Sequence, residues 1–238
     1  MQRETLTHRV VGLTLVVGLF VAAIGLATAI VRLANATVEV GDPGTVSRLL
    51  VNVFGLQVLG FGLAAVIFLW VRDVHWRSYL RLGEVSDWTL FYGVAVGLSM
   101  MLLTVAATGL FELLEIEAAE AQVGATEDPG FYLVLFIVST FVAVPMEEVF
   151  FRGILQRRLE DGFHPAIAIG VASLLFMAIH TGASVGTGGE LLALALFFSF
   201  GIVLGVSYSI TENLFVPVIG HATFNGVQIL VRAVEVAL

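Results

Sequence analysis

Two adjacent carboxylates and an arginine close to the end of a long apolar run are the first candidates for chemistry in this chain. Glu147, Glu148 and Arg152 follow the run FYLVLFIVSTFVAVPM. About 18 apolar residues suffice for a transmembrane helix, so these charges are expected at or below the level of the lipid headgroups. Charges at such depth are costly and tend to face a protein interior or a wet cavity. The helix is therefore predicted to carry a functional site.

The two glutamates are not equivalent, because neighbouring residues point about 100° apart around a helix. Glu148 and Arg152 are four residues apart with the glutamate first, which is the favoured order for an ion pair on a helix. This pair would keep Glu148 ionised and structural, and would leave Glu147 unpaired on its own face. Glu147 is therefore predicted to be the general base.

Two further apolar segments each carry two side chains of interest, spaced four residues apart. Phe176 and His180 form one pair, and His221 and Asn225 form the other, so each pair lies on one face of its helix. The turn at residues 161–162 lies about 21 Å from Glu147 and about 27 Å from His180, at 1.5 Å per helical residue. Antiparallel helices joined by that turn would bring Glu147 and His180 to a similar depth.

The composition places the chain among membrane proteins. Of the 238 residues, 58% are hydrophobic and 13% charged, and the mean hydropathy is +1.00. We predict an all-α polytopic transmembrane bundle that forms a single domain over residues 1–238, because this length suits about seven spans and no additional soluble domain. The predicted spans are 10–31, 49–71, 88–111, 131–151 (helical to about 159), 165–180, 191–208 and 215–233.

The charges predict an orientation. If the spans alternate, arginine clusters at 3–9, 72–81 and 152–158 fall on one side, which is expected to be cytoplasmic together with the N-terminus. The acidic loop 112–130 is expected on the opposite side. The first span is expected to remain as an anchor, since its apolar run exceeds a usual signal core. The location is thus predicted to be a cell membrane, crossed several times.

The net charge of −8 and the absence of lysine suit a halophilic prokaryote, with genome drift as the alternative explanation. Nucleic-acid binding is not expected, because no basic patch of the required density exists. The lack of cysteine excludes a disulfide, a thiol nucleophile and a thiolate metal site. The expected partners are the lipid bilayer and a membrane-associated substrate.

The residue types also narrow the chemistry of a hydrolytic site in the membrane. The chain has no HExxH zinc motif, Ser184 of GASVG (182–186) is expected in a loop with no supporting pattern, and the aspartates lie in loops or at span ends. One remaining option is a carboxylate and a histidine that activate water, with histidine and asparagine donating to the oxyanion. The other is Zn²⁺ held by His180, His221 and a glutamate such as Glu147. Residue types alone leave both open.

Three segments resemble the motifs of a known family. EEVFFRG (147–153), FMAIH (176–180) and HATFN (221–225) resemble the EExxxR, FxxxH and HxxxN motifs of the CPBP family. This family groups type II CaaX-processing endopeptidases with bacteriocin-processing and self-immunity (ABI) proteins. The motifs predict a catalytic core over residues 131–230, whereas the first three spans match only as generic membrane helices.

The resemblance implies a role for each motif residue. Glu147 would be the catalytic carboxylate and His180 its partner on the water, while His221 and Asn225 would stabilise the oxyanion. Three residues would support the motifs: Glu148, Arg152 and Phe176. The expected function is an intramembrane endopeptidase of the CaaX protease type that hydrolyses membrane-associated proteins or peptides, without a cofactor. A Zn²⁺-dependent protease and a non-proteolytic immunity or adaptor protein are the alternatives. A small transporter is disfavoured, because the chain shows no inverted repeat.

Overall fold

The computed structural model describes residues 2–38, 45–115, 126, 128–180 and 189–238, and this part of the chain is helical without a strand. The first helix is α1, Gln2–Val38. Two long helices are continuous through several segments. One comprises α2 (Thr45–Val53), η1 (Phe54–Gly62) and α3 (Leu63–Val71), and the other comprises α6 (Pro129–Val138), η2 (Ser139–Ala143), α7 (Val144–Glu148), η3 (Val149–Gln156) and α8 (Arg157–Glu160). The remaining helices are α4 (Trp76–Tyr79), α5 (Asp87–Leu113), α9 (Pro165–Ala178), α10 (Glu190–Thr211) and α11 (Phe215–Ala237).

The predicted all-α multi-pass membrane fold is confirmed. Five helices of the described chain are long and apolar enough to cross a membrane: Thr7–Ala36, Val46–Val71, Asp87–Leu113, Pro129–Glu160 and Glu190–Thr211. Helix α9 is apolar but shorter, and α11 has 23 residues. Each of the seven predicted spans therefore corresponds to a helix. The prediction that the fifth helix reaches His180 was wrong, because α9 ends at Ala178 and His180 lies in the turn that follows.

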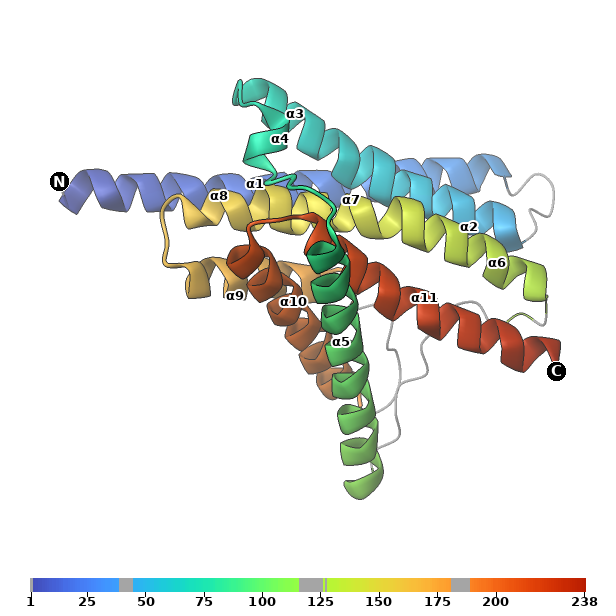
Figure 1. Ribbon diagram of the computed structural model, residues 1–238. Helices are drawn as coiled ribbons and strands as arrows, with labels where there is room; N and C mark the ends of the chain where they lie inside the picture. The colour runs from blue at the N-terminus through green and yellow to red at the C-terminus, as the bar shows by residue number, and fades with distance from the viewer. Residues whose placement is uncertain (1, 39–44, 116–125, 127, 181–188) are drawn as a thin grey trace.

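The long helices differ in direction. Helix α1, the helix 45–71 and the helix 129–160 run along the length of the molecule, and the chain termini lie at opposite ends (Figure 1). Helix α5 crosses this direction steeply and packs against α11, and α10 packs against α9. The middle of the helix 129–160 is thereby enclosed by helices from both halves of the chain.

The π-helical stretches of the two central helices, η1, η2 and η3, widen the backbone around the site. Pro145 supplies a local reason for η2, because proline has no N–H and its ring clashes with the carbonyl four residues before it. Single π-helical turns inside α-helices are frequent at functional sites. The irregular helix therefore marks the neighbourhood of Glu147 and Glu148.

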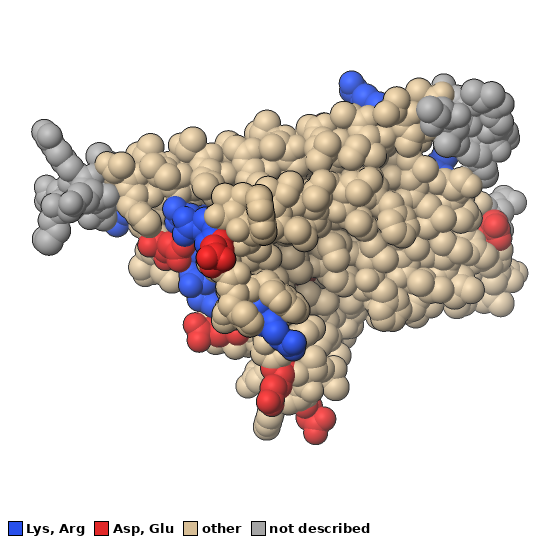
Figure 2. Space-filling model, turned by 90° about the horizontal axis from the view of Figure 1, so that it is seen from above, with Lys and Arg blue, Asp and Glu red and all other residues tan. Residues whose placement is uncertain are grey.

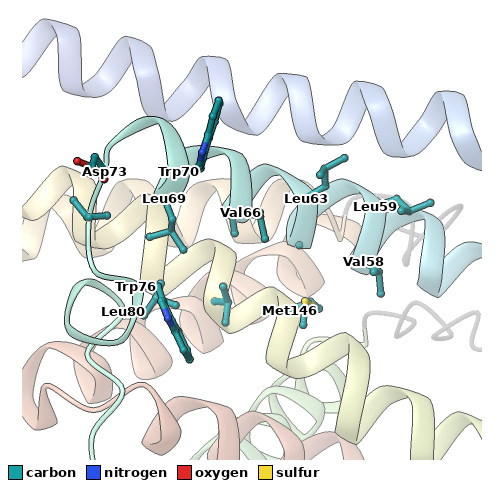
Figure 3. Close-up of a pocket in the computed structure, with 14 residues that line it drawn as sticks. Val58, Leu59, Leu63, Val66, Leu69, Trp70, Asp73, Trp76, Leu80 and Met146 are labelled. Carbon is teal, nitrogen blue, oxygen red and sulfur yellow. The ribbon is translucent and has the colours of Figure 1, made fainter.

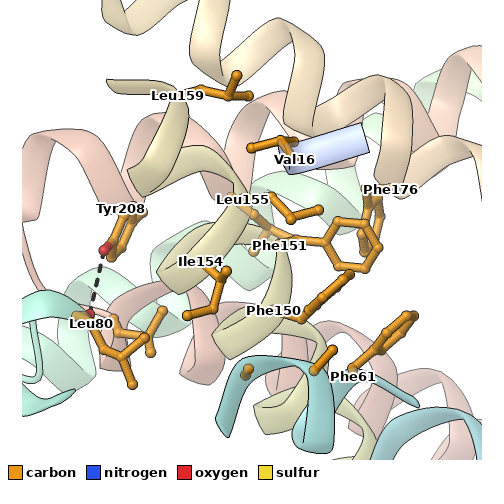
Figure 4. Close-up of a cluster of buried hydrophobic side chains, with 14 of the residues drawn as sticks. Val16, Phe61, Leu80, Phe150, Phe151, Ile154, Leu155, Leu159, Phe176 and Tyr208 are labelled. Atoms are coloured by element: carbon orange, nitrogen blue, oxygen red, sulfur yellow. Dashed lines mark hydrogen bonds between the residues drawn. The ribbon is translucent and has the colours of Figure 1, made fainter. Parts of the chain in front are cut away.

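Aromatic packing anchors the central helix. Phe150 and Phe151 are fully buried, and Phe150 stacks on Phe61 of η1 with ring centroids 4.7 Å apart. Phe151 meets Phe176 of α9 edge to face at 5.4 Å (Figure 4). Since lipid tails are as apolar as these rings, the stabilisation in a membrane comes from close packing. These contacts fix η3 against η1 and α9.

One arginine from each of the three predicted clusters contacts residues 160–162, namely Arg9, Arg81 and Arg157. Arg9 Nε donates to the carbonyl of Gly162 at 2.9 Å, and Arg81 lies 3.1 Å from Glu160. Charged side chains gather toward the N-terminal end, and the middle of the visible face is uncharged (Figure 2). The side chain of Arg152 is buried within the bundle, apart from these exposed charges.

Candidate active site

Glu148 is the most deeply buried charge of the site. Its two carboxylate oxygens each lie 3.2 Å from Arg152, Oε1 from Nη1 and Oε2 from Nε. Oε1 also lies 2.8 Å from Nδ1 of His221 on α11. Arg152 in turn donates through Nη2 to the carbonyl of Gly201 at 3.3 Å. The structure thus contains the ion pair expected from the sequence spacing, and adds a histidine to it.

Glu147 faces a different set of partners. Its Oε1 accepts a 2.6 Å hydrogen bond from Nε2 of Gln57 on η1. Its Oε2 lies 3.9 Å from Nε2 of His221, beyond direct hydrogen-bond distance. The expectation that Glu147 is unpaired considered only its own helix, and Gln57 was missed. The available signal was a single buried amide within the apolar run 53–71.

The ring of His221 lies between the two carboxylates and links them. An ionised carboxylate only accepts hydrogen bonds, so Nδ1 must carry the proton that binds Glu148. Nε2 then points its lone pair, or its N–H when the ring is charged, toward Glu147. A partner that holds one ring nitrogen in this way sets which nitrogen is available for chemistry. Glu148 therefore orients His221 as well as pairing with Arg152.

His180 lies at the edge of this cluster. Its ring stacks on Phe197 of α10 with centroids 4.3 Å apart, and its Nδ1 lies 2.8 Å from the carbonyl of Phe176. The carbonyl only accepts, so Nδ1 carries the proton and Nε2 is left as an acceptor. Within the described chain, no direct hydrogen bond joins His180 to Glu147 or to His221.

Phe176 connects the polar groups of the site. The guanidinium of Arg152 lies over its ring, 4.6 Å from the centroid. The rings of His180 and His221 lie 4.7 Å and 5.9 Å from it. A cation over an aromatic face is attracted by the negative charge density of the ring. Phe176 therefore supports the cluster through packing and through this contact.

Asn225 lies one turn beyond His221 on α11, half-buried. Its Nδ2 donates to Oγ of Ser139 at 3.5 Å, at the start of η2. Ser139 is buried and was not identified from the sequence. Asn225 therefore contacts η2, whereas His180 contacts α10.

The zinc set predicted as an alternative consists of Glu147, His180 and His221. No group of three or more His, Asp or Glu side chains close enough to hold a metal ion occurs in the described part of the chain. Nδ1 of His180 binds the carbonyl of Phe176, and Nδ1 of His221 binds Glu148, which leaves Nε2 of each ring available as a ligand. The zinc alternative therefore stays a prediction.

An apolar pocket of about 820 Å³ lies next to the site. It is bounded by the helix 45–71 on one side and by Met146 and Val149 on the other (Figure 3). Met146 precedes Glu147, and Val58 follows Gln57, so the pocket wall is adjacent to the Gln57–Glu147 hydrogen bond. Trp70 and Trp76 line its other end. Tryptophan favours membrane interfaces, so this end of the pocket is expected near the membrane surface.

Comparisons with known proteins agree with the motifs. Residues 129–227 match the Rce1-like family, described as type II CAAX prenyl endopeptidase Rce1-like. The chain is also 26% identical to the uncharacterized protein YpbD of Bacillus subtilis (strain 168) over 170 residues, which are 70% of this chain and 80% of that protein. No solved structure matches the chain. The family resemblance predicted from the three motifs is confirmed, and the matched segment contains all of them.

Proposed function

We propose that this multi-pass membrane protein is an intramembrane endopeptidase that cleaves membrane-associated proteins or peptides with a water molecule activated by Glu147. The observation that carries the proposal is the arrangement of two buried carboxylates around one histidine. Glu148 binds Nδ1 of His221 at 2.8 Å, and Glu147 faces Nε2 at 3.9 Å. One carboxylate thereby orients the ring, and the other is available as a base beside it.

The orientations of the two histidines support different roles. His180 presents Nε2 as an acceptor, which can receive a hydrogen bond from the attacking water and orient it toward Glu147. His221 presents an N–H at Nε2 when its ring is charged. Such an N–H, with the amide of Asn225, can donate to the oxyanion that forms during attack.

The reaction then follows in two proton transfers. Glu147 takes a proton from the water while the water oxygen bonds to the substrate carbonyl carbon and the carbonyl electron pair moves onto its oxygen. The tetrahedral intermediate collapses, the C–N bond breaks, and the proton on Glu147 passes to the leaving amine. The carboxylate is restored, and the products are a carboxylic acid and an amine.

A cleavage assay with purified protein in proteoliposomes tests this function. Internally quenched peptides carrying a membrane anchor serve as reporters, in prenylated and unprenylated forms so that the substrate class is also decided. Glu147→Gln removes the base and is expected to lower the rate by about 10³-fold or more, as for other members of catalytic groups that act as a unit. Glu235→Gln is the matched control, because Glu235 is an exposed residue that pairs with Arg232.

Three outcomes would contradict the proposal. Full activity of Glu147→Gln would show that this carboxylate is not the base, and a cellular effect that persists in this variant would favour an adaptor. Loss of cleavage on chelation and its return with Zn²⁺ would replace the proposed mechanism with the zinc-dependent alternative.

A further inference from the structure

Gln57 is the hydrogen-bond partner of Glu147 and comes from a part of the chain outside the matched family segment. It lies on η1, its side chain is 6% exposed, and its Nε2 lies 2.6 Å from Oε1 of Glu147. A hydrogen bond to an ionised carboxylate is among the stronger ones in proteins. The contact joins two helices at the candidate base.

The orientation of this amide follows from chemistry. Because the ionised carboxylate of Glu147 only accepts, the nitrogen of Gln57 must face it. The amide oxygen is then turned away, and it is buried with no hydrogen-bond partner in the described structure. A buried acceptor without a partner is destabilising. Stability alone therefore does not explain a glutamine at this position, where an apolar side chain would avoid that penalty.

Close packing on α1 holds Gln57 in this place. A Cβ on Gly60 would lie 2.9 Å from Cβ of Ala27, and one on Gly55 would lie 2.6 Å from Cγ2 of Val31. Both glycines let the backbone of η1 approach α1 more closely than larger residues would allow. The face of η1 that carries Gln57 is thereby directed toward Glu147.

We propose that Gln57 is a positioning residue of the reaction, which holds Oε1 of Glu147 so that Oε2 faces His221 and takes the proton from water. This inference rests on the proposed function. A carboxylate that turns freely would spend part of its time with neither oxygen aimed at the reaction centre, and misplacement by about 1 Å can cost about 100-fold in rate. The helix 45–71 thus contributes a positioning residue to the site, although it lies outside the three motifs.

Gln57→Leu tests the proposal in the same proteoliposome assay. We expect kcat to fall by about 10- to 100-fold with KM changed less than about two-fold, since positioning of the base affects the chemical step rather than binding. Gln228→Leu is the matched control, because Gln228 is an exposed glutamine that bonds only to the carbonyl of Phe224 on its own helix. Equal kcat values for Gln57→Leu and the wild type would overturn the proposal.

A double-mutant cycle separates positioning from a purely structural role. The shorter carboxylate of Glu147→Asp does not reach Gln57, so adding Gln57→Leu to that variant should change kcat by less than about two-fold. A full additional loss would show that Gln57 acts on something other than Glu147, and would overturn the proposal.

A labelling measurement tests the contact between Gln57 and Glu147 without relying on activity. Modification of Glu147 by a hydrophobic carbodiimide, followed by mass spectrometry, should be several-fold faster in Gln57→Leu than in the wild type, because the freed carboxyl oxygen is more accessible to the reagent. Equal labelling rates would overturn the inference. If the wild type cleaved no reporter while labelling differed as expected, the proposed function would fail and the Gln57–Glu147 contact would stand.

Discussion

The helix 129–160 carries two ion pairs with the same spacing and very different surroundings. Glu148 and Arg152 are four residues apart and only 0% and 1% exposed. Arg157 and Asp161 are also four residues apart, but their side chains are 28% and 27% exposed. The first pair binds His221 and a backbone carbonyl of α10, whereas the second lies at the charged end of the molecule. Identical spacing therefore gives a part of the site in one case and a surface contact in the other.

Depth explains the difference. Two charges that are removed from water lose their hydration free energy, and contacts with their partners must replace it. An exposed pair gains little free energy, because water already solvates both charges. The buried pair makes three hydrogen bonds and one further ion-pair contact, with partners on three helices. Disruption of the two pairs should therefore have unequal consequences.

Arg152→Leu should have the largest effect. It leaves the carboxylate of Glu148 buried without its cation, which typically costs about 3–5 kcal/mol. The measurement is unfolding in mixed micelles, monitored by circular dichroism as denaturing detergent is added. Cleavage activity should be lost in the same variant. A stability change below about 1 kcal/mol would mean that Glu148 is not held as an ionised partner.

Glu148→Gln should have an intermediate effect. The amide keeps the shape of the carboxylate but no longer holds His221 through a charge, so we expect kcat to fall by about 10- to 100-fold, as for other residues that orient catalytic groups. The fold should survive, because Gln can still bond to Arg152. The check is kcat together with the unfolding transition, with Asp161→Asn as the matched change in the exposed pair. Unchanged kcat would show that the Glu148–His221 contact does not serve the reaction.

Arg157→Leu should have the smallest effect. The exposed pair with Asp161 contributes about 0–1 kcal/mol at most, and salt should reduce that contribution further. The unfolding transition and the cleavage rate should both stay close to those of the wild type. A loss comparable to that of Arg152→Leu would contradict the contrast between the two pairs.

Local spacing identified much of the site. The four-residue step from Glu148 to Arg152 predicted their ion pair, because both ends lie on one helix whose geometry is known in advance. The apolar runs likewise predicted a helix for each of the seven spans. The comparisons confirmed the family resemblance, while the catalytic roles of Glu147, His180, His221 and Asn225 remain predictions.

Contacts between helices could not be predicted from the spacing of residues along one helix. Gln57 binds Glu147 across a separation of 90 residues, and no local pattern pairs the two positions. Composition likewise does not tell how deeply Arg152 is enclosed, because that depends on its contacts with α10 and α9. The shared use of His221 by Glu147 and Glu148 depends on the place of α11 relative to η1 and α7.

The sequence by itself determined the class of the protein, the helices and the residue types available for chemistry, because hydropathy and helical periodicity are local properties. The tertiary structure alone decided which oxygen of Glu147 is bound, which nitrogen of His221 faces it, and which of two equally spaced ion pairs is buried. These outcomes depend on how closely separate helices approach one another, and on how much of each charge the surrounding side chains cover.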